Sequence, residues 1–219
     1  MSDLSLKDFL RLAKKGNQIA VTRTVPCDLE TPVSCFLKMA RKESDAFLLE
    51  SAEQEEKIGR YSLLGFDPSE RVRSFGGSLE LTTGKRVSPL AVKQDLCGYL
   101  ETRLASVKLA NPEALPDFCG GWIGYFGYEN VASFEPVKLM KKKGLGLPDG
   151  IFFLVQDFVI FDHFRKTLTF AAIVPSGKNS AQGKQSYQKA IRTLNDFEKR
   201  LQVPLKPLKH KKESAKTSF

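Results

Sequence analysis

The segment from Phe118 to Gly127 holds four glycines and four aromatic residues in ten positions, and no other part of the chain is so unusual. Glycine lets another backbone approach closely, and the rings supply apolar area, so the segment predicts tightly packed backbone in a core or at a seam. A dinucleotide-binding loop needs G-x-G-x-x-G between a strand and a helix. Here Gly121, Gly124 and Gly127 recur every third residue, and nothing basic is close enough to cradle a phosphate. We therefore expect a packing motif rather than a ligand loop.

The size and apolar content of the chain are those of a globular protein. Its 219 residues are 42% hydrophobic and 10% aromatic, which is ample for a core in one large domain or two small ones. The longest apolar runs, 151–155 and 158–161, are far shorter than the roughly 20 residues that cross a bilayer. Residues 1–5 carry neither a basic nor an apolar signal region. These features predict a cytoplasmic protein that does not contact a membrane.

The net charge of +9 is concentrated in two places, a loop with Lys138 and Lys141 to Lys143 and the tail at 204–219. Aromatic residues do not interleave with either lysine cluster, and no recognised nucleic-acid module accompanies them. Solvated lysines are therefore expected, and no nucleic-acid partner.

The cysteines and histidines show no pattern typical of a metal or redox site. Cys27, Cys35, Cys97 and Cys119 are widely scattered and include no C-x-x-C pair, so they predict reduced, mostly buried thiols. The two histidines, at 163 and 210, fall in a turn and in the basic tail, where they lack the neighbours of a metal site or a catalytic triad. The sequence thus predicts no metal in this chain.

Periodicity and turn signals predict an α+β fold with mostly antiparallel sheet and helices packed outside. Two helices are expected from Ser5 to Ala13 and from Thr31-Pro32 to about Lys42. A third is expected after Ser88-Pro89, with an apolar stripe formed by Leu90, Leu96, Cys97, Leu100 and Leu104. A fourth is expected through the final amphipathic run, whose apolar face is formed by Tyr187, Ala190, Ile191, Leu194, Phe197 and Leu201. Strands are expected at 19–25, 46–51, 61–66, 71–75, 78–82, 151–161 and 168–174. Gly76-Gly77 predicts one hairpin turn, and 162–166 another.

The domain boundary is expected near residue 203. Residues 1–203 carry the periodic segments and are interpreted as one domain, whereas 204–219 is a basic tail or linker rich in proline and lysine with no apolar period.

Motifs for catalysis are missing, since the chain has no nucleophile elbow, P-loop, H-E-x-x-H helix or suggestive pair of carboxylates. The sequence therefore names no catalytic residue. What remains is an apolar strand that ends in Glu50 and Ser51, followed by Gly59 to Ser62. An anion and a hydroxyl beside an apolar wall can hold the ammonium group of a small amino acid. The alternative is an ordinary strand edge with a solvated Glu50.

Three motifs carry a resemblance to a known family: Leu48-Leu49-Glu50-Ser51, then Gly59-Arg60-Tyr61-Ser62, then Gly120 to Glu129. In order and spacing they resemble the amino-terminal region of anthranilate synthase component I, over about 25–201. The large subunit of aminodeoxychorismate synthase has a similar glycine-aromatic segment and stays an alternative, but the first two motifs favour the anthranilate branch.

The resemblance implies a large sandwich of two antiparallel sheets with helices outside. It also implies an enzyme that adds ammonia, delivered by a glutamine amidotransferase subunit (component II), to chorismate and eliminates pyruvate to leave anthranilate, with Mg²⁺ required. In the family, the first motif lines the site for tryptophan, the feedback effector. The resemblance implies that Leu49, Glu50 and Ser51 of this chain line the tryptophan site, with Tyr61 and Ser62 as weaker members. Glu50 would take the ammonium group, and Ser51 would bind the backbone end of the amino acid.

The departure from the family is large. None of the motifs of its chorismate pocket, magnesium-binding glutamates or catalytic histidine occurs in this sequence. The chain is therefore expected to act only with a separate catalytic, chorismate-binding half. The alternative is a stand-alone module without enzyme activity that senses tryptophan or serves as a scaffold.

Overall fold

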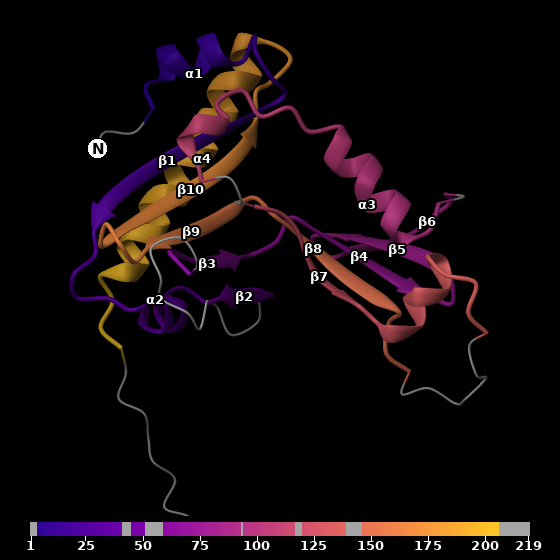
Figure 1. The fold of residues 1–219 in the computed structure, drawn as a ribbon. Helices are drawn as coiled ribbons and strands as arrows, with labels where there is room; N and C mark the ends of the chain where they lie inside the picture. Colours follow the sequence, from indigo (N-terminus) through magenta and orange to yellow (C-terminus); the bar gives the residue numbers. More distant parts are fainter. Residues whose placement is uncertain are drawn as a thin grey trace, which may run out of the picture.

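Two five-stranded antiparallel sheets form the framework of this computed structural model, which describes residues 4–40, 45–50, 59–92, 94–116, 120–138 and 146–205. The sheets lie beside each other, and helices cover the first sheet along one face (Figure 1). Within these two sheets, neighbouring strands of the described part of the chain pair antiparallel. The expected α+β fold is confirmed.

The first sheet has the order β1-β10-β9-β3-β2. Its strands are β1 (Gln18–Pro26), β10 (Thr167–Pro175), β9 (Asp157–Asp162), β3 (Tyr61–Phe66) and β2 (Ala46–Leu49). The helices α1 (Leu6–Leu12), α2 (Pro32–Met39) and α4 (Ser180–Leu201) pack on one face. Alternate strand residues such as Leu64, Val159 and Phe170 meet Leu194 and Phe197 of α4 in the largest buried core.

The second sheet has the order β6-β5-β4-β8-β7. Its strands are β4 (Glu70–Phe75), β5 (Ser78–Thr83), β6 (Arg86–Leu90), β8 (Gly150–Val155) and β7 (Gly121–Phe126). The helix α3 (Leu96–Ala105) packs on this sheet, and its Tyr99 and Leu100 join Val72 in a smaller core. The Gly76-Gly77 turn is confirmed, because both residues have positive φ, 53° and 80°.

The expected single strand over 151–161 is wrong. It is two strands, β8 in the second sheet and β9 in the first, and the chain passes between the sheets at Gln156. The hairpin of β9 and β10 is confirmed, with Phe161 opposite Leu168. The apolar run therefore serves two cores, since Phe152 packs in the smaller one and Val159 in the larger one.

The expected helix start at Ser88-Pro89 is also wrong. Both residues lie in β6, where Pro89 is paired opposite Glu80, and α3 begins only after Asp95. The Asp95 carboxylate accepts a hydrogen bond from the Gly98 amide at 2.8 Å, which caps the helix. Proline is tolerated here because β6 is an edge strand.

Replacing Asp95 by alanine is expected to lower the free energy of unfolding by about 1 kcal/mol, because the first turn of α3 loses its side-chain cap. The change Ser88→Ala, at the position that the sequence suggested as the cap, serves as the matched control. It should alter stability far less. Urea unfolding of both variants decides the point, and equal losses would contradict the assignment of the cap to Asp95.

The other helix boundaries follow the sequence more closely. Ser5 caps α1 as expected, and Thr31 and Ser34 form a reciprocal capping box on α2. Helix α2 ends at Met39, before the expected Lys42, while 41–44 lie outside the described residues. Helix α4 begins at Ser180, ahead of Tyr187 where the expected amphipathic run starts, because Asn179 caps it there.

Outside the α-helices and strands, the described residues also form the short 3₁₀ segments Pro112–Ala114 and Tyr128–Ser133. Residues 51–58 and the tail from 206 onward are not described, so the expected boundary near 203 stays a prediction. Within the described part of the chain, no helix is long and apolar enough to cross a membrane.

The glycine-aromatic segment forms β7, an edge strand of the second sheet. Its tight packing is confirmed at Gly124, where an added Cβ would lie 1.9 Å from the carbonyl oxygen of Ile151 in β8. Trp122 packs edge-on against Tyr99 with the ring centroids 6.3 Å apart. Farther along, Tyr125 and Phe126 are each 43% exposed. The segment thus packs at its start and presents rings to solvent at its end.

Candidate functional site

A cavity of about 380 Å³ lies at one end of the first sheet, under the start of α2. It is formed where β1 and β2 end and where β9 turns into β10. The lining residues are mostly polar or charged: Cys27, Asp28, Glu30, Thr31, Pro32, Glu50, Phe161, Asp162, His163 and Lys166. The strand end that the sequence singled out therefore opens into a real cavity, through Glu50.

Asp162 fixes the turn that forms one wall. Its carboxylate accepts the amides of Phe164 and Arg165 at 3.1 and 2.9 Å. Arg60 donates to both carboxylate oxygens, with Nη2 2.7 Å from Oδ2 and Nε 3.1 Å from Oδ1. Burial acts to raise the pKa of Asp162, but the bonds and charge of Arg60 and the two amides outweigh it and lower that pKa. Asp162 is therefore a fixed carboxylate that shapes the turn.

His163 is held against the cavity by Ser62. The Ser62 hydroxyl lies 2.7 Å from His163 Nε2, and Ser62 is fully buried. The His163 amide donates to the Arg60 carbonyl at 2.9 Å, and its ring stacks on Phe161 with the centroids 5.7 Å apart. Sequence reasoning placed His163 in a turn but missed this partner, which lies about a hundred residues earlier. The only available signal was the serine of the Gly59–Ser62 motif.

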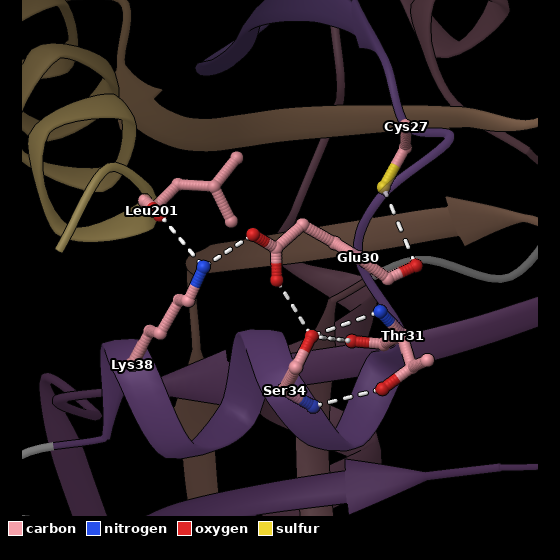
Figure 2. A network of polar contacts seen from close by, with 6 residues as sticks. All are labelled: Cys27, Glu30, Thr31, Ser34, Lys38 and Leu201. Atoms are coloured by element: carbon pink, nitrogen blue, oxygen red, sulfur yellow. Dashed lines mark hydrogen bonds and ion pairs between the residues drawn. The ribbon is translucent and has the colours of Figure 1, made fainter. Parts of the chain in front are cut away.

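Glu30, another carboxylate of the lining, is already occupied by neighbours. Figure 2 shows it between Lys38 and Ser34 of α2: Lys38 forms an ion pair with it, and the Ser34 hydroxyl donates to it at 2.6 Å. Lys38 also donates to the Leu201 carbonyl at 3.1 Å, which ties α2 to the end of α4. Glu30 therefore holds the helices in place rather than offering a charge to the cavity.

The remaining charged residues of the lining carry both signs. Glu50, Asp28 and Lys166 are exposed. Lys166 adopts φ of 52°, and its carbonyl accepts a hydrogen bond from the Cys27 amide at 2.9 Å. The backbone at Lys166 is therefore held in place, which fixes the position of its Cα at the cavity wall. A cavity that offers carboxylates and an ammonium group suits a zwitterion, which needs a partner for each of its charges.

Strand alternation separates the predicted site residues between the two faces of the first sheet. Glu50 lines the cavity on the helix side, and Ser62 reaches it through His163. On the opposite side, Leu49 lines a small apolar pocket with Trp122 and Ile123. Tyr61 lines a third depression, a groove of about 700 Å³.

Ser51, the fifth predicted residue, lies outside the described residues. Among the described residues, no group of three or more histidine, cysteine, aspartate or glutamate side chains could hold a metal ion.

Comparisons of this chain with protein families, known sequences and solved structures agree with one another. Residues 44–219 match the family model described as chorismate binding enzyme. The chain is 33% identical to the probable anthranilate synthase component 1 of Schizosaccharomyces pombe, over 95% of this chain and 40% of that protein. It is also 33% identical to anthranilate synthase component 1 of Synechocystis, over 91% of this chain and 39% of that protein.

A solved structure has a related fold. The crystal structure of anthranilate synthase component I from Streptococcus pneumoniae TIGR4 matches with a TM-score of 0.52 and 20% identity, over 84% of this chain and 37% of that one. The chain thus spans about two fifths of the length of the curated relatives named above.

Proposed function

Because this chain belongs to the family of chorismate binding enzymes, we propose that it forms the amino-terminal, tryptophan-binding part of an anthranilate synthase component I. The names of the relatives support the anthranilate branch over the aminodeoxychorismate branch. In this proposal the complete enzyme adds ammonia to chorismate and releases pyruvate and anthranilate. This part supplies the control by tryptophan, and a chorismate-binding part supplies the chemistry.

In this proposal, the ammonia supply and the Mg²⁺ site of the complete enzyme lie outside the described part of this chain. A glutamine amidotransferase subunit (component II) would deliver ammonia. The described residues offer no cluster of metal ligands, so Mg²⁺ would be held by residues outside the described part of this chain. The role of the described part is then to bind and orient an effector.

The observation that carries the proposal is the cavity at Glu50 with its two kinds of charge. Glu50 would accept hydrogen bonds from the ammonium group of the amino acid, and Ser51, next in the chain, would bind its backbone end. Lys166, which also lines the cavity, would form an ion pair with the carboxylate of the bound amino acid. Ser62 would act through His163, whose ring it holds at the wall. Leu49 and Tyr61 face the other side of the sheet, so they would support the site rather than touch the ammonium group.

Replacing Glu50 by glutamine is expected to weaken L-tryptophan binding about tenfold, since one charge-assisted hydrogen bond of an exposed carboxylate is lost. Calorimetry with two analogues of tryptophan shows which group of the ligand Glu50 contacts. Tryptamine keeps the ammonium group and should lose affinity as tryptophan does. Indole-3-propionate lacks it and should bind the wild type and the variant alike.

Glu101→Gln is the matched control, because Glu101 is an exposed carboxylate of α3 away from the cavity. It should leave tryptophan affinity unchanged. A Glu50→Gln protein that binds tryptophan as tightly as the wild type would contradict the assigned role of Glu50.

A further inference from the structure

The strand β7 has one edge without a partner strand. It lies at the border of the second sheet (Figure 1), and within the described part of the chain it pairs with β8 alone. In an antiparallel pair, every second residue directs its N–H and C=O groups at the neighbouring strand, and the residues between them direct theirs away. Half of the backbone groups of β7 therefore point away from β8.

The contact at the end of β7 identifies the residues that point away. The Gly127 amide donates to the Asp149 carbonyl at 2.6 Å, so Gly127 faces β8. By alternation the residues at 121, 123 and 125 also face β8, whereas Trp122, Gly124 and Phe126 face away. Among the described residues, no hydrogen-bond partner reaches the backbone of these three. The outer edge of β7 thus presents a row of free donors and acceptors.

This edge lacks the features that keep edge strands from pairing. Natural edges are blunted by charged side chains, by proline or by a covering segment. Residues 121–127 contain no charge and no proline, and residues 124–126 are exposed. By contrast, β6 contains Pro89, and β1 is covered at Ala20, whose backbone exchanges hydrogen bonds of 3.0 and 2.9 Å with the Asn111 side chain. The edge of β7 is therefore open to a further strand.

Two pockets adjoin the start of β7, and both have Gly121 and Trp122 in their linings. One, of about 490 Å³, lies toward α3 and has polar as well as apolar walls. Its Gln18 Oε1 is buried and has no hydrogen-bond donor among the described residues. The other pocket is small and lined by apolar side chains such as Leu49 and Ile123. Because side chains alternate between the two faces of a sheet, a strand added to β7 sends one set toward each pocket.

We propose, resting on the function proposed above, that β7 pairs with a strand of the chorismate-binding part of the enzyme and that the second sheet continues into that part. This chain matches only 40% of the Schizosaccharomyces pombe relative, so the larger share of such a protein lies outside the matched part and can supply the strand. Backbone hydrogen bonds hold the strand, and the two pockets select long donor side chains on one face and apolar ones on the other. The net charge of +9 disfavours a second copy of this chain as the occupant.

Hydrogen exchange at single residues tests the pairing. The chain is produced with the part of the Synechocystis relative that it does not match, and exchange is measured by mass spectrometry with electron-transfer fragmentation. In the chain alone, the amides of Trp122, Gly124 and Phe126 should exchange fast, whereas those of Ile123 and Tyr125, which face β8, should exchange slowly. In the complex, the first three should slow by about a hundredfold or more, so that protection becomes continuous along β7.

The alternating pattern separates strand addition from other contacts. If the complex makes anthranilate but the three amides exchange as fast as in the chain alone, strand addition is overturned and the proposed function stands. If no complex forms, both are overturned. Protection of the three amides in the chain alone, at twice its mass in light scattering, would show that a second copy occupies the edge and would also overturn the proposal.

Replacing Tyr125 by lysine places a charge at this edge. Tyr125 is 43% exposed, and the lysine should weaken binding of the chorismate-binding part about tenfold or more, because an added strand would bury the charge. Val87→Lys is the matched control, since Val87 is an exposed apolar residue of β6, at the opposite edge of the same sheet. It should bind as the wild type does.

Surface plasmon resonance measures both affinities, and circular dichroism establishes that each variant is folded. Binding by Tyr125→Lys as tight as that of the wild type would contradict pairing at β7. If Tyr125→Lys does not fold, the exchange pattern of the wild-type chain decides.

Discussion

Replacing Gly124 by alanine is expected to cost about 3 kcal/mol or more of unfolding free energy, because the new Cβ has no room. It would lie 1.9 Å from the Ile151 carbonyl oxygen and 2.8 Å from the Phe152 Cα. Both are backbone atoms of β8, so no side-chain rotation relieves the clash. The strand β7 must move away from β8, and the ladder between them is disrupted.

Urea unfolding measures this loss, and Gly98→Ala is the matched control. Gly98 lies in α3, where the nearest atom to an added Cβ is 3.4 Å away, so alanine should be neutral or slightly stabilising there. Equal stability of Gly124→Ala and the wild type would contradict the close approach of the two strands.

Replacing Asp157 by asparagine is expected to stabilise the protein by up to about 3 kcal/mol near about pH 8. Burial raises the pKa of Asp157 from 3.8 to about 6; Lys189 acts to lower it and Asp67 to raise it. Because the pKa is higher in the folded state, the native carboxyl favours folding below its unfolded pKa. That contribution is lost as the pH rises through about 6. Asparagine carries no charge to bury and avoids the loss.

The pH profile distinguishes this cause from a packing change. The stability difference between Asp157→Asn and the wild type should shrink as the pH falls through about 6 and vanish near about pH 4. Asp28→Asn, which removes an exposed carboxylate, is the control for the loss of a surface charge. Parallel stability curves for Asp157→Asn and the wild type would show that burial of a charge is not the cause.

Local signals in the sequence predicted much of the secondary structure. Ser5 and Thr31 each cap the helix that the sequence assigned to them, and Gly76-Gly77 makes the expected turn. These features succeed because caps and positive φ are decided by residues within one turn of each other.

Features that depend on distant contacts could not be read in this way. The run from Ile151 to Phe161 is apolar almost throughout and has no glycine or proline to mark its division at Gln156, which is decided by the two cores that it serves. Ser88-Pro89 has the local pattern of a helix start, yet pairing with β5 keeps it extended. The predicted site residues also alternate between the two faces of one sheet, so adjacent positions in a motif lead to different cavities.

The proposed function as a whole is tested most directly by reconstitution. The chain is produced together with the part of the Synechocystis relative that it does not match, and the pair is supplied with chorismate, Mg²⁺ and an ammonium salt. We expect anthranilate fluorescence that neither part gives alone, that falls on addition of L-tryptophan, and that is less sensitive to tryptophan with Glu50→Gln. A co-purifying pair that makes anthranilate at the same rate with and without tryptophan, or makes none, would contradict the proposal.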